Sequence, residues 1–131
     1  MEQLKSLTSA EEMVMRVIFE HEEDLNLMEI RDECNRRYEK EWAPQTVSTF
    51  LHRLVEKEYV TLYRQGRVFY YHRIVDEKDY LKRKTSEFVS FWFHNNADEM
   101  LQALMTERAL SSRELNRTRE ICSKLGGEVR L

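Results

Sequence analysis

Apolar residues recur every three to four positions in several stretches of this chain, which is the spacing that buries one face of a helix. Two stretches begin with a capping box, in which a short polar side chain precedes a glutamate by three residues: Thr8 with Glu11, and Asn26 with Glu29. The run 25–27 between the first two helices is short enough for a single bridging strand. The predicted helices cover about 10–22, 28–38 and 44–57, a long segment from Asp76 through Trp92, and then 97–107 and 112–125.

The pattern changes over residues 59–71, where β-branched and aromatic residues form two short runs, 59–63 and 68–71. Between them lies Arg64-Gln65-Gly66-Arg67, which predicts a hairpin with Gly66 at a turn position of positive φ. Three helices followed by a hairpin with a basic tip are typical of a winged helix-turn-helix. The sequence therefore predicts a mainly α fold with a small β wing, divided into a winged helix-turn-helix DNA-binding domain over 1–75 and a helical dimerisation region over 76–131.

Segment 42–57 carries the strongest functional pattern, because one face of the predicted helix is apolar and the other is polar. Pro44 suits the first helical turn, where an amide hydrogen has no intrahelical partner. The polar face starts at the N-terminal end, which enters the groove when a helix-turn-helix docks on DNA. The apolar face consists of Val47, Phe50, Leu51 and Leu54. The candidate DNA-binding residues are Gln45, Thr46, Thr49 and Arg53 on this helix and Arg64, Gln65 and Arg67 on the wing.

The net charge of −3 at first argues against a nucleic-acid partner, but the charges are segregated along the chain. Residues 1–43 hold six Lys and Arg against twelve Asp and Glu, residues 44–75 hold five against two, and residues 76–131 hold ten of each. Because DNA binding depends on the local charge of the docking face, the basic middle third, residues 44–75, is the part that predicts a DNA partner.

The C-terminal half carries more large apolar side chains than a few short helices can bury against one another. A second copy of the chain would cover them and would place two recognition helices about one DNA turn, roughly 34 Å, apart. We therefore predict a homodimer. The candidate dimerisation residues are Phe88, Phe91, Trp92, Met100, Leu101, Leu104, Leu115 and Ile121.

The sequence offers no pattern of catalytic chemistry: no nucleophile with a neighbouring base, no phosphate-binding loop and no paired catalytic carboxylates. The four histidines are scattered among different predicted elements, without the spacing that gathers metal ligands. Cys34 and Cys122 lack a CxxC arrangement, so we expect two reduced, partly buried thiols. The sequence thus predicts a protein that is not an enzyme and that needs neither cofactor nor metal.

No run of residues approaches the roughly 18 apolar residues of a membrane span, and the acidic N-terminus lacks the order of a signal peptide. We expect a cytoplasmic protein with no direct membrane insertion.

Three groups of residues carry a resemblance to a known family. They are Leu7 to Glu11 with Val14, Met15, Val17 and Ile18; Trp42, Ala43, Pro44, Thr46, Val47, Thr49, Leu51, Arg53, Leu54 and Lys57; and Gly66, Arg67, Tyr70 and Tyr71. The chain resembles the penicillinase-repressor family, which includes the methicillin-resistance repressor and, more distantly, repressors of copper-transport operons. The resemblance implies a homodimer that represses resistance or stress genes from a dyad operator, and a membrane sensor protease whose signal leads to its cleavage.

The chain departs from the family pattern at several positions. Ala43 replaces a serine, which removes a capping hydroxyl that typically contributes about 1 kcal/mol. Glu58 replaces a glycine, so either the helix ends differently or Glu58 takes a left-handed conformation at a cost of roughly 1–2 kcal/mol. The Asn-Phe bond cut in antibiotic-responsive members aligns with Ala103-Leu104, which argues against induction by cleavage at this candidate position. The cysteine-rich tail of the copper-responsive members is missing, so we do not expect copper sensing.

The residues leave one alternative function open. A winged helix can also serve as a protein–protein interaction module without specific DNA binding, here with the acidic first third facing a basic partner. Salt discriminates between the two functions, because binding to several phosphates weakens steeply with salt, whereas a mainly apolar protein interface does not.

Overall fold

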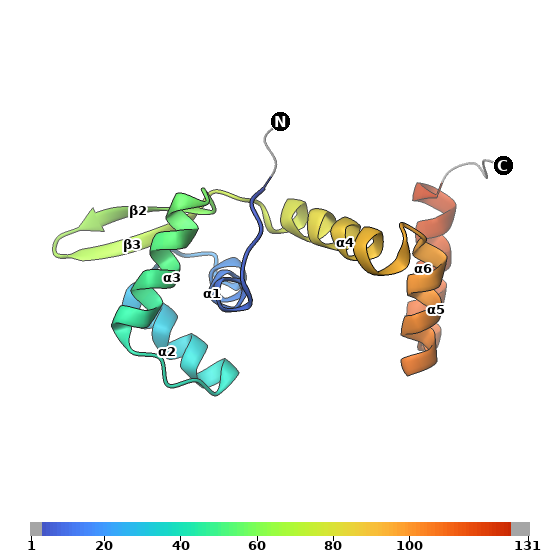
Figure 1. Ribbon diagram of the computed structural model, residues 1–131, viewed down its shortest axis with the longest axis horizontal. Coiled ribbons are helices and arrows are strands. Elements are labelled where there is room, and N and C mark those ends of the chain that lie inside the picture. The colour runs from blue at the N-terminus through green and yellow to red at the C-terminus, as the bar shows by residue number, and fades with distance from the viewer. Residues whose placement is uncertain (1–3, 127–131) are drawn as a thin grey trace. The chain divides into compact units, whose positions relative to one another are not determined.

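The computed structural model describes residues 4–126 and is mostly helical with one small antiparallel sheet (Figure 1). The elements in chain order are α1 (Ser9–Glu20), β1 (Leu25–Asn26), α2 (Leu27–Tyr38), α3 (Pro44–Glu56), β2 (Val60–Gln65), β3 (Val68–Arg73), α4 (Glu77–Phe93), α5 (Ala97–Glu107) and α6 (Ser112–Leu125). This order confirms the predicted fold class. The predicted helices at 97–107 and 112–125 have the bounds found for α5 and α6, whereas α1 ends two residues earlier than expected.

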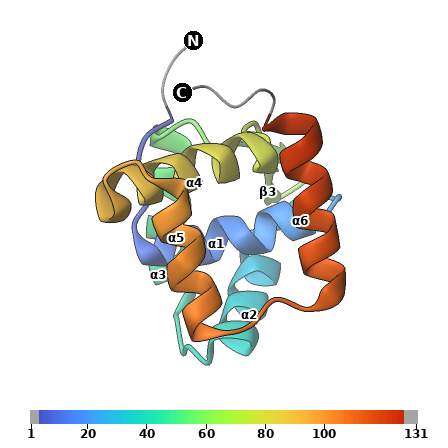
Figure 2. The ribbon, with the colours of Figure 1, turned by 90° about the vertical axis from the view of Figure 1, so that its right-hand side faces the viewer.

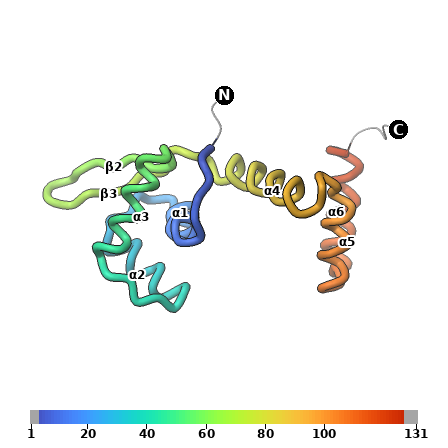
Figure 3. Tube along the Cα trace, viewed as in Figure 1, coloured from blue at the N-terminus to red at the C-terminus, as the bar shows by residue number. Residues whose placement is uncertain are grey.

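The chain divides into two compact units, Met1–Arg83 and Lys84–Leu131, with the division inside α4. In the first unit α1, α2 and α3 pack on one another, and the sheet has the strand order β1-β3-β2. Tyr71 at the middle of β3 pairs with Leu25 on one side and with Leu62 on the other. The hairpin of β2 and β3 extends away from the three helices (Figure 3). The predicted division at residue 75 stays a prediction.

The core of the first unit lies between its three helices and the base of the sheet. Three of the four residues on the predicted apolar face of α3 are fully buried, and Phe50 is partly exposed. The Phe50 ring packs against the Trp42 ring in an edge-to-face arrangement, with 5.1 Å between the ring centres. Tyr59 and Ile30 are also fully buried. Burial of one face of α3 leaves the opposite face free to meet a partner.

Both predicted capping boxes are present. The Thr8 hydroxyl accepts a bond from the Glu11 amide at 3.2 Å, and the Glu11 carboxylate accepts one from the Thr8 amide at 3.0 Å. Asn26 and Glu29 exchange the same two bonds, each at 2.9 Å. These reciprocal bonds satisfy amides that a helix start leaves without partners, and they fix where α1 and α2 begin.

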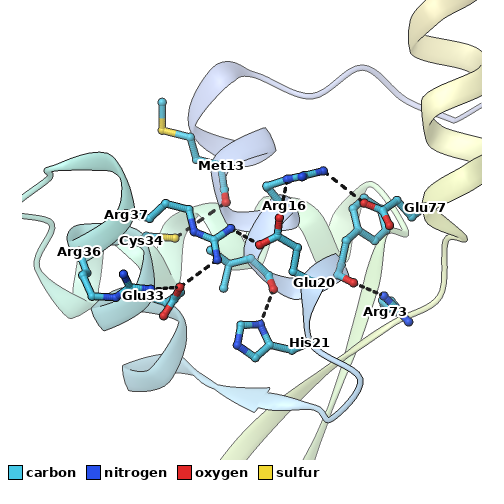
Figure 4. A network of polar contacts seen from close by, with 12 residues as sticks. Met13, Arg16, Glu20, His21, Glu33, Cys34, Arg36, Arg37, Arg73 and Glu77 are labelled. Carbon is cyan, nitrogen blue, oxygen red and sulfur yellow. Dashed lines mark hydrogen bonds and ion pairs between the residues drawn. The ribbon is translucent and has the colours of Figure 1, made fainter. Parts of the chain in front are cut away.

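A network of ion pairs joins the helices on the side shown in Figure 4. The Arg37 guanidinium contacts the carboxylates of Glu20 and Glu33, with a distance of 2.9 Å to Glu33. Arg16 lies 2.9 Å from Glu20 and 3.4 Å from Glu77 at the start of α4. The acidic residues of the first third are thus partly neutralised by cations within the same unit.

In the second unit, α5 and α6 run in opposite directions on either side of a short turn (Figure 2). Arg108 forms a two-pronged ion pair with Glu114 across this turn, at 3.0 and 2.9 Å. Ser111 and Glu114 form a further capping box. Among residues 84–126, Val89 alone is buried. None of the helices in residues 4–126 combines the length and apolarity that a bilayer crossing needs.

Candidate nucleic-acid interface

The helix α3 starts without a side-chain cap. Ala43 at the N-cap makes no side-chain hydrogen bond, as its methyl group dictates, and Pro44 occupies the first turn. The preceding connection is instead fixed by Asn35, whose side chain donates to the Trp42 carbonyl at 3.0 Å and accepts from the Trp42 amide at 2.9 Å. This pair of bonds, which the sequence pattern did not reveal, holds the turn between α2 and α3.

The predicted polar face of α3 lies on the outside of the unit. Gln45, Thr49 and Arg53 are exposed and Thr46 is partly exposed, so the structure brings all four candidates onto one accessible helix face. The Thr49 hydroxyl donates to the Gln45 carbonyl at 3.1 Å. The hydroxyl oxygen of Thr49 can at the same time accept a bond from a base edge.

The C-terminal end of α3 shows which of the two expected arrangements Glu58 adopts. The Lys57 amide caps the helix by donating to the Arg53 carbonyl at 2.9 Å, and Glu58 follows with φ 64°. A non-glycine residue therefore accepts the left-handed conformation, which typically costs roughly 1–2 kcal/mol. The reversal sends the chain directly into the buried Tyr59 and the first wing strand.

The wing tip is a turn of two residues, Gly66 and Arg67, because β2 continues to Gln65, two residues beyond the predicted run. Gly66 has φ 64°, which confirms the predicted positive-φ position. The Arg64 side chain donates to the Gly66 carbonyl at 2.7 Å and lies 5.8 Å from the centre of the Phe69 ring. Arg64, Gln65 and Arg67 are all exposed at the tip.

The base of the wing is tied to the loop before β1. Asp24 accepts a bond from the Tyr63 hydroxyl at 2.7 Å and lies 3.0 Å from the Nδ1 atom of His72. Burial alone would raise the pKa of Asp24, but the bonds from His72 and Tyr63 outweigh it and lower the pKa. An ionised Asp24 thus connects both wing strands to the helical part of the unit.

Three of the five cations in residues 44–75 make internal contacts: Arg64 at the wing tip, as described above, and Lys57 and Arg73. The Lys57 ammonium lies 2.6 Å from the Glu11 carboxylate, and the Arg73 guanidinium donates to the Phe19 carbonyl at 2.6 Å. Neither Arg53 nor Arg67 makes an ion pair or hydrogen bond within residues 4–126, and both are exposed. The cations available to a phosphate are therefore on the α3 face and at the wing tip.

Several other predicted residues lie in the second unit. Phe91 and Trp92 are 73% and 64% exposed, and Ala103 and Leu104 lie inside α5. Cys122 is exposed rather than partly buried, because no other element within residues 4–126 covers it, whereas Cys34 is fully buried. Burial raises the pKa of Cys34 to about 11. Within the described part of the chain, no three His, Cys, Asp or Glu side chains gather to hold a metal ion.

The three-helix unit, the exposed polar face of α3 and the basic hairpin together define a winged helix-turn-helix protein. The profile of one family, described as penicillinase repressor, matches residues 7–124. The chain belongs to the penicillinase repressor family. It is 30% identical over 121 residues to the penicillinase repressor of Bacillus licheniformis, covering 92% of each protein. It is 26% identical to the methicillin resistance regulatory protein MecI of Staphylococcus aureus (strain N315), covering 90% of this chain and 94% of MecI.

Two solved structures resemble part of the chain. One is the solution structure of the DNA-binding domain of the repressor BlaI, with a TM-score of 0.51 and 35% identity. The other is the monomeric form of Bacillus licheniformis BlaI in complex with the blaP half-operator, with a TM-score of 0.50 and 35% identity. Each covers 61% of this chain and 94% of the solved chain. The likeness thus confirms the winged-helix fold.

Proposed function

We propose that the protein is a transcriptional repressor that binds a dyad DNA operator as a homodimer and controls antibiotic-resistance or stress genes. The observation that carries the proposal is the exposed polar face of α3 beside a basic wing, in a chain that belongs to a family of repressors. The named relatives, a penicillinase repressor and a methicillin-resistance regulator, support the assignment to resistance genes.

The two parts of the interface have different roles. Gln45, Thr46, Thr49 and Arg53 enter the major groove, where amide, hydroxyl and guanidinium groups match the donors and acceptors of base edges. Arg64 and Arg67 lie along the sugar–phosphate backbone, where they add affinity without much sequence information. Replacing Arg53 by alanine is expected to cost about 1–3 kcal/mol of operator binding and to relax the base preference.

The exposed apolar residues of the second unit support a homodimer. Phe88, Phe91 and Trp92 on α4 expose large rings, and Leu101, Leu104 and Ile121 add further apolar surface on α5 and α6. Surface of this kind is rarely left open to water in a soluble protein. Two copies that cover it would bring two α3 helices to the half-sites of one operator, and sedimentation should give a dimer at micromolar concentration.

A membrane sensor protease is a further proposed partner, but the release signal is not expected to be a cut at Ala103-Leu104. This bond lies inside α5, where the Arg108 amide still donates to the Leu104 carbonyl at 3.0 Å. A protease that needs an extended substrate would first have to unwind the helix, and the Asn-Phe pair of antibiotic-responsive members is absent.

The test is selection of bound sequences from a random duplex pool at physiological salt. The wild type should enrich a palindromic motif, and a Thr46→Ala/Thr49→Ala variant should lose it. Thr106→Ala is a matched control, because the Thr106 hydroxyl donates to the carbonyl four residues earlier, as that of Thr49 does, but outside α3. If the wild type enriches nothing at any salt, the protein-binding alternative replaces the repressor.

A further inference from the structure

The segment before α1 is fastened to the far end of the recognition helix. The Lys57 ammonium donates to the Ser6 carbonyl at 2.8 Å, and the Tyr59 hydroxyl donates to the Lys5 carbonyl. Leu4 and Leu7 pack against the core beside these contacts. Residues some fifty positions apart are thus joined where α3 ends and turns into the wing.

At the centre of this junction lies the carboxylate of Glu11, which is only 1% exposed. Its Oε1 atom lies 2.6 Å from the Lys57 ammonium and also accepts the Thr8 amide at 3.0 Å. Its Oε2 atom is buried and has no hydrogen-bond partner in the described part of the chain. Burial alone would raise the pKa of Glu11, but the bond from Lys57 and the nearby charge of Arg53 help to lower it.

A buried ion pair is a poor source of stability, because removing two charges from water costs about as much as their attraction returns. Such a pair does restrict geometry, since moving one partner leaves the other charge buried and alone. Here the restricted element is the C-terminal end of α3, which carries Arg53 one turn before Lys57.

We propose that Glu11 and Lys57 are a positioning pair that sets the orientation of α3, and that the contacts of segment 4–8 hold the end of α3 in place. The proposal rests on the proposed function, because it requires a sequence-specific operator. In this role the pair acts without contacting DNA. Glu11 is buried, and Lys57 is turned inward with 26% of its side chain exposed.

A different role for Lys57 makes the opposite prediction. If Lys57 bound a phosphate, replacing Glu11 would release the ammonium toward DNA, strengthen binding to every sequence and steepen the salt dependence. A positioning pair instead predicts weaker binding to the operator, with random-sequence affinity and salt dependence unchanged. The ratio of operator to random-sequence affinity therefore separates the two roles.

The experiment uses the full chain and the operator selected by the wild type, with Glu11→Gln, Lys57→Met and the double variant. Removing one partner leaves a lone buried group, so a single variant can fail to fold, whereas the double variant removes both charges. We expect each folded variant, the double one included, to lose about tenfold in the affinity ratio, the size of effect seen for positions that do not touch the ligand.

Glu114→Gln is the matched control, because Glu114 is also a capping-box glutamate with a basic partner, but on α6. It should leave the ratio unchanged. A folded double variant with the wild-type ratio would overturn the positioning role and leave the repressor intact. A wild type that selects no operator would remove both proposals together.

Discussion

Replacing Arg67 by glutamine removes one cation from each wing tip without disturbing the hairpin, because Gly66 supplies the positive-φ turn position. Each phosphate that a cation neutralises contributes about 0.9 to the slope of log affinity against log salt. A dimer loses two such contacts, so the slope should become shallower by about 1.8. For a fourfold rise in salt, from about 50 to about 200 mM, the wild type should lose about 12-fold more affinity than the variant.

The assay is a titration of the operator duplex and of a random duplex at several salt concentrations. Arg67→Gln should flatten the slope for both sequences alike, because a phosphate contact carries no sequence information. Arg73→Gln is the control from the same hairpin, since the Arg73 guanidinium is already bound to the Phe19 carbonyl, and it should leave the slope unchanged. The assignment of Arg67 as a free cation and Arg73 as an occupied one would be refuted by an unchanged salt slope in Arg67→Gln, or by an equal flattening of the slope in both variants.

Three further predictions concern stability and titration. Glu58→Gly should raise the free energy of unfolding by up to about 1 kcal/mol, because it relieves the left-handed strain; a lower melting temperature would contradict this. A thiol reagent in native buffer should modify Cys122 promptly and Cys34 only on unfolding, because burial raises the pKa of Cys34 to about 11; two reactive native thiols would contradict it. The ion pair with Arg108 and the bonds from Ser111 lower the pKa of Glu114 to about 2. This contribution to stability is therefore present above the unfolded pKa, near 4.5, and is lost as the pH falls toward 2; carboxyl NMR titration should find that value, and a higher one in Arg108→Gln.

Local signals in the sequence were sufficient for the fold and for the exposed polar face of α3. The capping boxes at Thr8 and Asn26 depend on residues three positions apart, and the hairpin turn depends on one glycine. The apolar face of α3 follows from helical spacing, which also places Gln45 and Thr49 on the accessible side. Each of these features is decided within one or two turns of chain, where the sequence pattern is informative.

The contacts that could not be predicted join residues far apart in the sequence. Glu11 and Lys57 are separated by 46 positions, and Arg73 and Phe19 by 54. In the sequence Glu11 is a capping residue and Lys57 one of several cations, and only the tertiary packing makes them partners. The exposure of Cys122 likewise depends on tertiary packing, because helical spacing does not decide whether another element covers α6.

The small number of free cations links the proposed dimer to operator binding. Of the five Lys and Arg residues in 44–75, Lys57 and Arg73 are held in contacts inside the unit, and Arg64 donates to the Gly66 carbonyl at the exposed wing tip. Within the described residues this leaves Arg53 and Arg67 without an internal partner, in a chain with a net charge of −3. One copy offers the two wing arginines, Arg64 and Arg67, to phosphates, whereas the proposed dimer offers four, and each added phosphate contact raises the electrostatic part of the affinity. The apolar surface around Phe91 and Trp92 would thus contribute to operator affinity without touching DNA, by joining two weakly charged interfaces.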